Sequence, residues 1–251
     1  MGRVIVVANQ KGGVGKTTTV VNLGAALSLA EKKVLVIDMD PQKNSTSGIG
    51  ADVNGSVSVY NVLMGLSSVA DNIIETELPF LRLLPSTDEM QGFEVEVLEK
   101  ENRAFLLKNA VDKIKNDYDF VLIDTPPSLS FITVNSLVAA EEVLIPLQAE
   151  YYALEGLSQL LKTINEVQQA YNPELEILGV VITMFDERTN LSKQVEDDAR
   201  AFFGEKVFQT RIPRNVRLSE APSFGKPIFL YDVKSRGAIS YLNLAKEIIS
   251  G

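Results

Sequence analysis

The stretch 4-VIVVANQKGGVGKTT-18 joins an apolar run, a glycine-rich turn and the start of a helical pattern. Residues 3–8 form a strand pattern, because Arg3 is followed by the apolar and mostly β-branched run 4–8, and residues 17–30 have helical spacing. Glycines at such a junction let consecutive backbone N–H groups point at an anion, and the helix adds its positive N-terminal end. The junction therefore predicts a phosphate-binding loop, with Lys16 on the β/γ oxygens and Thr17 as a Mg²⁺ ligand.

This loop departs from the usual pattern of phosphate-binding loops. G-x-x-x-x-G-K-[ST] would place glycine at position 10, where the chain has Gln10, and a second lysine, Lys11, follows it. On the residues alone, Lys11 is either a solvated surface side chain or a second phosphate ligand.

Strand and helix patterns alternate along the rest of the chain. Further strands are expected at 33–38, 81–84, 120–124, 142–146 and 178–184. Further helices are expected at 102–117, 130–140, 155–170, 192–203 and 236–249. The alternation predicts an α/β fold, a doubly wound and mostly parallel sheet with helices on both faces. Because no linker or repeat divides the chain, we expect a single domain over 1–251.

Acidic residues stand at the ends of two apolar strands. Asp38 and Asp40 end the run 34–37, and Asp124 ends the run 120–123. Ligands of open parallel sheets bind at the carboxyl ends of the strands, so these side chains are expected near the phosphate loop. Carboxylates beside a triphosphate repel it unless a divalent cation lies between them, which implies Mg²⁺.

The composition restricts the available chemistry. The 251 residues include neither Cys nor His, which excludes thiolate nucleophiles, imidazole bases and cysteine-bound zinc or iron–sulfur clusters. No secretory-signal pattern or membrane-length apolar run is present, so a cytoplasmic protein is expected. The net charge is −9, but residues 211–251 carry seven basic and three acidic residues, which leaves room for a local basic face.

At these motifs the chain resembles the ParA/Soj family of chromosome- and plasmid-partition ATPases, of the chromosomal Soj type. This family belongs to a deviant Walker A group that includes MinD and the nitrogenase iron protein. The resemblance covers essentially the whole chain. It rests on residues 9–18 (NQKGGVGKTT), 38–42 (DMDPQ), 122–128 (LIDTPPS), 150–157 (EYYALEGL) and 212–222 (IPRNVRLSEAP).

The resemblance implies roles for individual residues in binding and slowly hydrolysing ATP with Mg²⁺. Lys11 would reach across an ATP sandwich homodimer to the phosphates of the other subunit. Asp40 would position the attacking water, Asp124 would hold Mg²⁺ through water, and Asp38 is a less direct neighbour. The remaining nucleotide contacts are Gly12, Gly13, Val14, Gly15, Lys16, Thr17 and Thr18 at the phosphates, and Pro213, Asn215 and Met184 at the adenine.

The resemblance also implies macromolecular partners. The ATP dimer would bind double-stranded DNA nonspecifically through Arg188 and Arg217, and a ParB-type centromere-binding protein would stimulate hydrolysis. The protein would then lie at the nucleoid, with a replication initiator as a further partner. It would not bind a membrane. Other basic residues that support a DNA-binding face are Arg211, Arg214, Lys226 and Arg236.

Three alternatives have different requirements. A MinD-like membrane-cycling ATPase needs a basic amphipathic tail, whereas residues 239–249 carry one Lys and one Glu. A reductase iron protein needs cysteines, which are absent. A metabolic enzyme such as a cobyrinate or dethiobiotin synthetase needs an acceptor pocket that the sequence does not locate.

Overall fold

The described part of the chain contains one eight-stranded sheet. The computed structural model describes residues 2–53, 56–151, 153 and 155–251, so Tyr152 and Leu154 of the 150–157 motif lie outside the described residues. The strand order is β3-β4-β2-β5-β1-β6-β7-β8, and only the β3–β4 pair is antiparallel. The strands are β1 (Arg3–Val7), β2 (Val34–Asp38), β3 (Ile74–Glu75), β4 (Leu81–Leu84), β5 (Phe120–Asp124), β6 (Glu142–Gln148), β7 (Glu176–Phe185) and β8 (Val207–Pro213).

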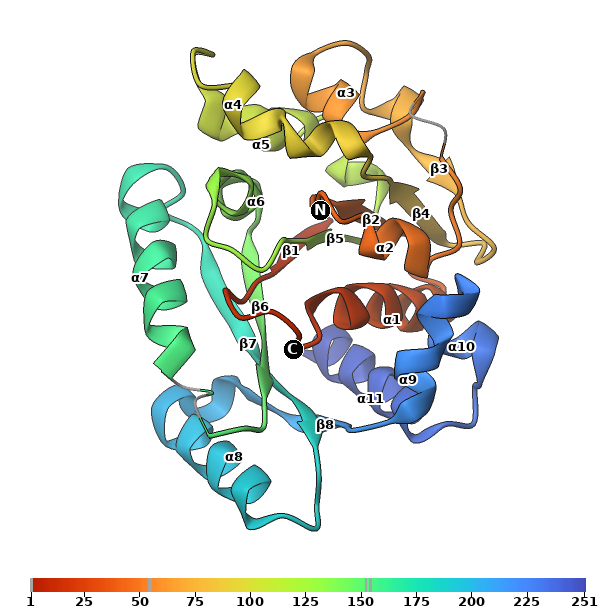
Figure 1. Cartoon of the computed structure of the whole chain (residues 1–251), viewed down its shortest axis with the longest axis vertical. Helices are drawn as coiled ribbons and strands as arrows, with labels where there is room; N and C mark the ends of the chain where they lie inside the picture. The colour runs from red at the N-terminus through yellow and green to blue at the C-terminus, as the bar shows by residue number, and fades with distance from the viewer. Residues whose placement is uncertain (1, 54–55, 152, 154) are drawn as a thin grey trace.

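Helices cover both faces of the sheet, which confirms the predicted doubly wound α/β fold (Figure 1). Side chains of β1 alternate between two cores, with Val4 and Val6 in one and Ile5 and Val7 in the other. The first core contains residues of α3 (Val59–Met64), α4 (Phe93–Glu96), α5 (Leu106–Val111), α6 (Phe131–Ala139), α7 (Glu155–Ala170) and α8 (Asn190–Phe203). The second contains residues of α1 (Lys16–Leu29), α9 (Val216–Glu220), α10 (Ile228–Tyr231) and α11 (Arg236–Ser250).

Two regions differ from the sequence-based expectation. The helix expected at 102–117 is interrupted: α5 covers only Leu106–Val111, between 3₁₀ turns at Arg103–Phe105 and Lys115–Asp117. Asn102 adopts a left-handed conformation, and Ile114 leaves the helical region to pack into the core. The sequence patterns also missed β8, an edge strand whose polar residues 209–211 obscure the apolar alternation.

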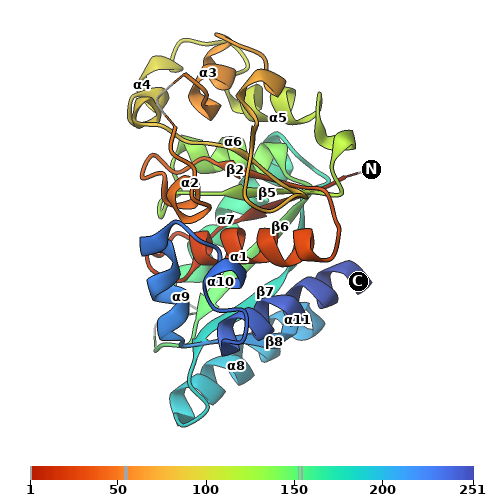
Figure 2. The same ribbon diagram turned by 90° about the vertical axis from the view of Figure 1, so that its right-hand side faces the viewer.

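The parallel strands place their carboxyl ends at one edge of the sheet. Val7 of β1 and Asp38 of β2 both pair with Asp124 of β5, so the two acidic strand ends adjoin the loop that follows β1. Figure 2 shows the chain termini on one side of the molecule and α2 (Asn44–Gly48) and α9 on the opposite side. The candidate site lies at this carboxyl edge.

Candidate nucleotide-binding site

The loop between β1 and α1 is shaped by glycines in the left-handed region. Gly13 has φ +76° and Gly15 has φ +92°, conformations that strain residues with a Cβ. Gly15 is the N-cap of α1 and offers no capping side chain, so the first N–H groups of this 14-residue helix remain available to an anion. The Thr183 hydroxyl donates to the carbonyl of Val14 at 2.8 Å and fixes the loop against β7.

The two lysines of the loop have different environments. Lys16 is 6% exposed, and its ammonium donates to the carbonyl oxygen of Lys11 at 3.1 Å. Burial lowers the pKa of Lys16, while the carboxylates of Asp124 and Asp40 act in the opposite direction. The Lys11 side chain is 40% exposed and forms an ion pair with Glu150. Lys16 is thus a buried cation at the loop, whereas Lys11 lies at its rim.

Asp38 holds the segment that follows β2. One of its carboxylate oxygens accepts from both the backbone N–H and the hydroxyl of Thr46, each at 2.7 Å. The other oxygen accepts from the N–H of Asp40 at 3.1 Å. Burial, with the nearby Asp124 carboxylate, raises the pKa of Asp38 to about 7. Asp38 therefore acts on the site by fixing Asp40, which is itself buried.

Asp124 has one oxygen in use and one free. Its Oδ2 accepts from the Ser45 hydroxyl of α2 at 2.7 Å, while its buried Oδ1 makes no hydrogen bond within the described residues. Burial raises the pKa of Asp124 to about 6, and the neighbouring hydroxyls of Ser45 and Thr17 lower it. An unsatisfied buried carboxylate oxygen beside a hydroxyl fits a hard cation or one of its water ligands.

The described residues do not form a complete metal cage. Searched together, they contain no group of three or more His, Cys, Asp or Glu side chains that could hold a metal ion alone. Mg²⁺ keeps several waters and takes phosphate oxygens as ligands. The site therefore fits Mg²⁺ only as part of a nucleotide complex.

Two adjoining cavities lie over this edge. One of about 250 Å³ is lined by the residues Gly13, Gly15, Lys16, Thr17, Thr18, Asp40, Asn44, Pro127 and Met184. The second, of about 400 Å³, shares Gly15, Thr18 and Met184 with the first and also includes Pro213 and Asn215. The loop and the three residues expected at the adenine therefore line two adjoining cavities.

Other predicted residues lie around these cavities without lining them. The described residues that line these two cavities do not include Lys11, Gly12, Val14 or Asp124. Val14 is buried, and Asp124 lies beneath the loop. Asn215 also has a structural role, because its Oδ1 caps α9 by accepting from the N–H of Leu218 at 3.3 Å.

Sequence reasoning did not identify several residues that shape the site. Ser45 and Thr46 of α2 hold Asp124 and Asp38, and both hydroxyls are buried. Asn9 joins the loop to β6, because its amide donates to the carbonyl of Pro146 at 2.8 Å and its Oδ1 accepts from the N–H of Lys11 at 3.0 Å. A run of polar residues directly after the acidic strand end was the available signal for Ser45 and Thr46.

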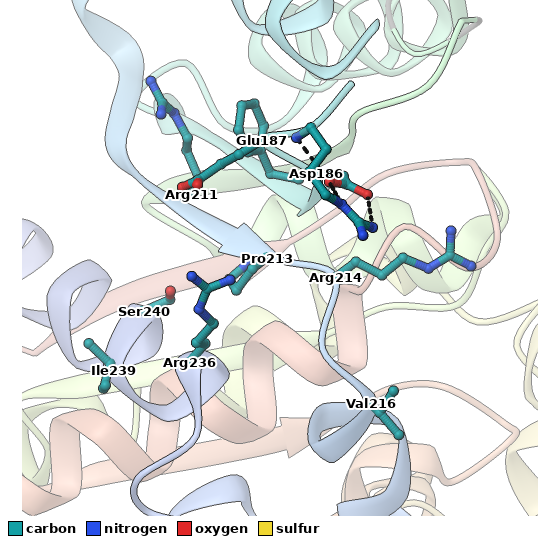
Figure 3. A pocket seen from close by; sticks show the side chains of 11 residues that line it. Asp186, Glu187, Arg211, Pro213, Arg214, Val216, Arg236, Ile239 and Ser240 are labelled. Atoms are coloured by element: carbon teal, nitrogen blue, oxygen red, sulfur yellow. Dashed lines mark hydrogen bonds and ion pairs between the residues drawn. The ribbon is translucent and has the colours of Figure 1, made fainter. Parts of the chain in front are cut away.

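The arginines expected at DNA occupy two different places. A third cavity, of about 590 Å³, is lined by Arg211, Arg214 and Arg236 (Figure 3). It is also lined by Arg188. The Arg188 side chain is 87% exposed and pairs with Asp186 at 2.7 Å, an interaction that lowers the pKa of Asp186 to about 2. Arg217, on α9, instead pairs with Glu220 at 2.9 Å and with Asp232 at 3.4 Å.

The four arginines around the third cavity differ in whether an acidic side chain pairs with them. Arg211 pairs with Glu196 and stacks over the ring of Phe185. Arg214 and Arg236 form no ion pair within the described part of the chain. Figure 3 shows them projecting from the end of β8 and the start of α11. Three of the seven basic residues of the segment 211–251 therefore line this cavity.

No helix among the described residues is long and apolar enough to cross a membrane.

The chain is similar in sequence to a known protein family and to several known proteins. A family model described as "AAA domain" matches residues 2–177. The chain is 52% identical to the sporulation initiation inhibitor protein Soj of Bacillus subtilis, covering 99% of this chain and 98% of that protein. It is 50% identical to the chromosome partitioning protein ParA of Myxococcus xanthus, covering 99% of this chain and 88% of that protein.

Solved structures show the same fold. A structure named cobyrinic acid a,c-diamide synthase of Mycobacterium smegmatis, with bound ADP and magnesium, has a TM-score of 0.86 and 40% identity, with 99% of this chain and 94% of that chain covered. The cell division ATPase MinD of Pyrococcus furiosus has a TM-score of 0.83 and 29% identity, with 100% and 99% of the chains covered.

Proposed function

Because the chain belongs to the ParA/Soj family of chromosome-partitioning ATPases, we propose that it is a dimerising ATPase that binds DNA nonspecifically in its ATP state. In this proposal a ParB-type partner stimulates hydrolysis, and the cycle segregates chromosomes or plasmids on the nucleoid in the cytoplasm. The observation that carries the proposal is the buried, unsatisfied Oδ1 of Asp124 beneath a glycine loop that holds a buried Lys16. A gel shift on random duplex DNA with no nucleotide, ADP and ATP in parallel tests it, because only ATP should produce a shift.

The loop is suited to the phosphates of ATP. The free N–H groups at the start of α1 and the ammonium of Lys16 face the smaller cavity, which Thr17 and Thr18 also line. Thr17, with Asp40 and Asp124 acting through water, would hold Mg²⁺, which supplies charge neutralisation at the β and γ phosphates. The second cavity, between Met184 and Pro213, would take the adenine. The ADP and magnesium named in the solved relative support this assignment.

The hydrolytic machinery is limited to positioning and charge. Asp40 lines the cavity of about 250 Å³ at the glycine loop and its backbone is held by Asp38, which supports a role in orienting an attacking water. The chain has no His, so no imidazole base is available to take a proton from the attacking water. We therefore propose slow hydrolysis in the absence of the partner.

The affinity for Mg²⁺ with nucleotide should decrease in acid. Burial raises the pKa of Asp124 to about 6, so the carboxylate is ionised above that pH and binds a proton below it. Because a proton and the hydrated cation compete for the same carboxylate, lowering the pH from 8 to 5 should weaken Mg²⁺ binding about tenfold. Titration calorimetry of Mg²⁺ into the ADP complex at several pH values measures this, and an affinity that stays constant down to pH 5 would contradict it.

The DNA contact is proposed to include Arg188 and Arg217 from each subunit. Four phosphate contacts in a dimer correspond to a slope near −3.6 for log affinity against log salt, as an order of magnitude. Arg217→Glu should leave ATP-dependent dimerisation intact, weaken DNA binding at least about tenfold and reduce the slope to about −1.8.

Fluorescence anisotropy of a labelled random duplex across a salt series measures the effect of Arg217→Glu. Lys162→Glu is the control, because it makes the same charge change on α7, away from α9 and from the cavity lined by Arg188, Arg211, Arg214 and Arg236. It should leave the salt slope unchanged. DNA affinity that Arg217→Glu does not alter would remove Arg217 from the contact.

Two other activities remain candidates. A MinD-like membrane cycle would require the C-terminal helix to leave the core, but α11 buries Tyr241, Leu244 and Ile248. Pelleting with liposomes and ATP tests this, and lipid binding without DNA binding would favour it. The name of the solved Mycobacterium smegmatis structure makes small-molecule amidation the second candidate. ATP hydrolysis that depends on cobyrinic acid would favour that activity.

A further inference from the structure

The loop lysine proposed to act between subunits has a partner within its own chain. The ammonium of Lys11 forms an ion pair with the carboxylate of Glu150, which lies two residues beyond the end of β6. β6 pairs in parallel with β1, so the segments that follow these two strands leave the sheet side by side at the same edge. Glu150 is thus the carboxylate that the fold places beside the rim of the phosphate loop.

The backbone around Lys11 is fixed while its side chain is not. The N–H of Lys11 donates to Asn9, and its carbonyl accepts from Lys16. Asn9 is in turn anchored to the carbonyl of Pro146 in β6. The side chains of Lys11 and Glu150 are 40% and 32% exposed. Only the Lys11 side chain can therefore change partner without rebuilding the loop.

We propose that Glu150 is a positioning residue that holds Lys11 in the monomer and competes for it with the phosphates of a second subunit. The inference rests on the proposed ATP dimer. An ammonium drawn to a phosphate of another subunit shares its charge with that phosphate, so the ion pair with Glu150 weakens when the dimer forms. Two-fold symmetry makes the exchange happen twice in each dimer. Glu150 also carries negative charge, which repels an approaching triphosphate.

Removing the charge of Glu150 should therefore tighten the dimer. Sedimentation equilibrium with Mg²⁺ and a non-hydrolysable ATP analogue compares wild type with Glu150→Gln. Loss of two partly exposed ion pairs should lower the dimer dissociation constant about 2- to 30-fold. Glu174→Gln is the matched control, because Glu174 is exposed and lies before β7, at the opposite end of the sheet from the loop. An unchanged or larger dissociation constant for Glu150→Gln would overturn the proposal.

A second measurement reports on the ion pair itself. In the nucleotide-free monomer, reaction of lysines with an acylating reagent, followed by peptide mass spectrometry, gives the modification rate of Lys11. The rate should rise at least about twofold in Glu150→Gln, because an amine that no carboxylate holds is more accessible to the reagent, and Glu150→Asp should restore most of the protection. An equal rate of Lys11 modification in wild type and Glu150→Gln would show that the two side chains do not interact in solution.

The two proposals can fail separately. If wild type stays monomeric with the ATP analogue, the ATP dimer is wrong, and the competition for Lys11 is wrong with it. If wild type dimerises with the ATP analogue and the dimer dissociation constant of Glu150→Gln is no lower than that of wild type, only the role of Glu150 is wrong.

Discussion

Lys11→Ala is expected to bind nucleotide normally but to remain monomeric with ATP. Lys11 does not line the cavity of about 250 Å³ at the glycine loop of its own chain. Its loss should therefore change the nucleotide affinity of the monomer less than about threefold. In the proposed dimer the same side chain contacts a phosphate of the other subunit, and two such charged contacts would be lost. Removing one partner of a close charged pair costs about 2–5 kcal/mol, so dimer affinity should fall about 1,000-fold or more.

Light scattering on gel-filtered samples, with Mg²⁺ and either ADP or an ATP analogue, measures the oligomeric state of Lys11→Ala. Lys193→Ala, an exposed lysine of α8, removes the same charge elsewhere and should dimerise as wild type does. An ATP-dependent dimer of Lys11→Ala would refute the proposed contact between subunits.

Asp40→Ala is expected to trap the ATP-bound dimer. Asp40 is buried, lines the cavity of about 250 Å³ at the glycine loop and is held by the Asp38 carboxylate, so its removal takes away the group proposed to orient water. Misplacing a reacting water lowers rates about 100-fold, whereas the proposed contacts of Lys16 and of the helix start with the phosphates remain. Hydrolysis should fall by about 100-fold or more while dimers and DNA complexes persist with ATP itself.

Single-turnover hydrolysis of radiolabelled ATP, together with light scattering over the same hours, measures both parts of this result. Asp40→Asn keeps the size of the side chain and should behave in the same way. Asp197→Ala, an exposed residue of α8, is the control for loss of one carboxylate. Loss of the ATP-dependent dimer in Asp40→Ala would mean that Asp40 has a structural role instead.

The central part of the fold could be predicted because its strands are buried on both faces. β1, β2 and β5 are nearly continuous apolar runs, and such runs are characteristic of parallel strands covered by helices. β8 pairs only with β7, so its outward residues are polar, and nothing local distinguishes Gln209 or Thr210 from loop residues. The β3 strand has two residues, which is too short for a periodic pattern to appear.

The candidate site was predictable where its chemistry is contiguous in the sequence. The glycine loop and the acidic strand ends belong to short segments, and the rule that ligands bind at the carboxyl ends of parallel strands predicted that Asp40 and Asp124 lie near Lys16. The contacts of Ser45 with Asp124 and of Lys11 with Glu150 join residues 79 and 139 positions apart, and they depend on strand order that no local pattern contains. The environment of Arg217 was hidden for the same reason, because Asp232 reaches it only through the folding of the C-terminal segment.

The hydrogen bonds of Asp38 have a consequence for where the timing of the cycle is set. Asp38 fastens the residues from Asp40 to Thr46, and the Thr46 hydroxyl accepts from the N–H of Ser86 and so extends the same network beyond β4. These hydrogen bonds therefore fix Asp40 and the residues that follow it within a single chain. Under the proposed function, the delay before hydrolysis then originates at the surface where two copies meet. A regulator that shortens the delay would act at that surface and would not need to change the interior of either copy.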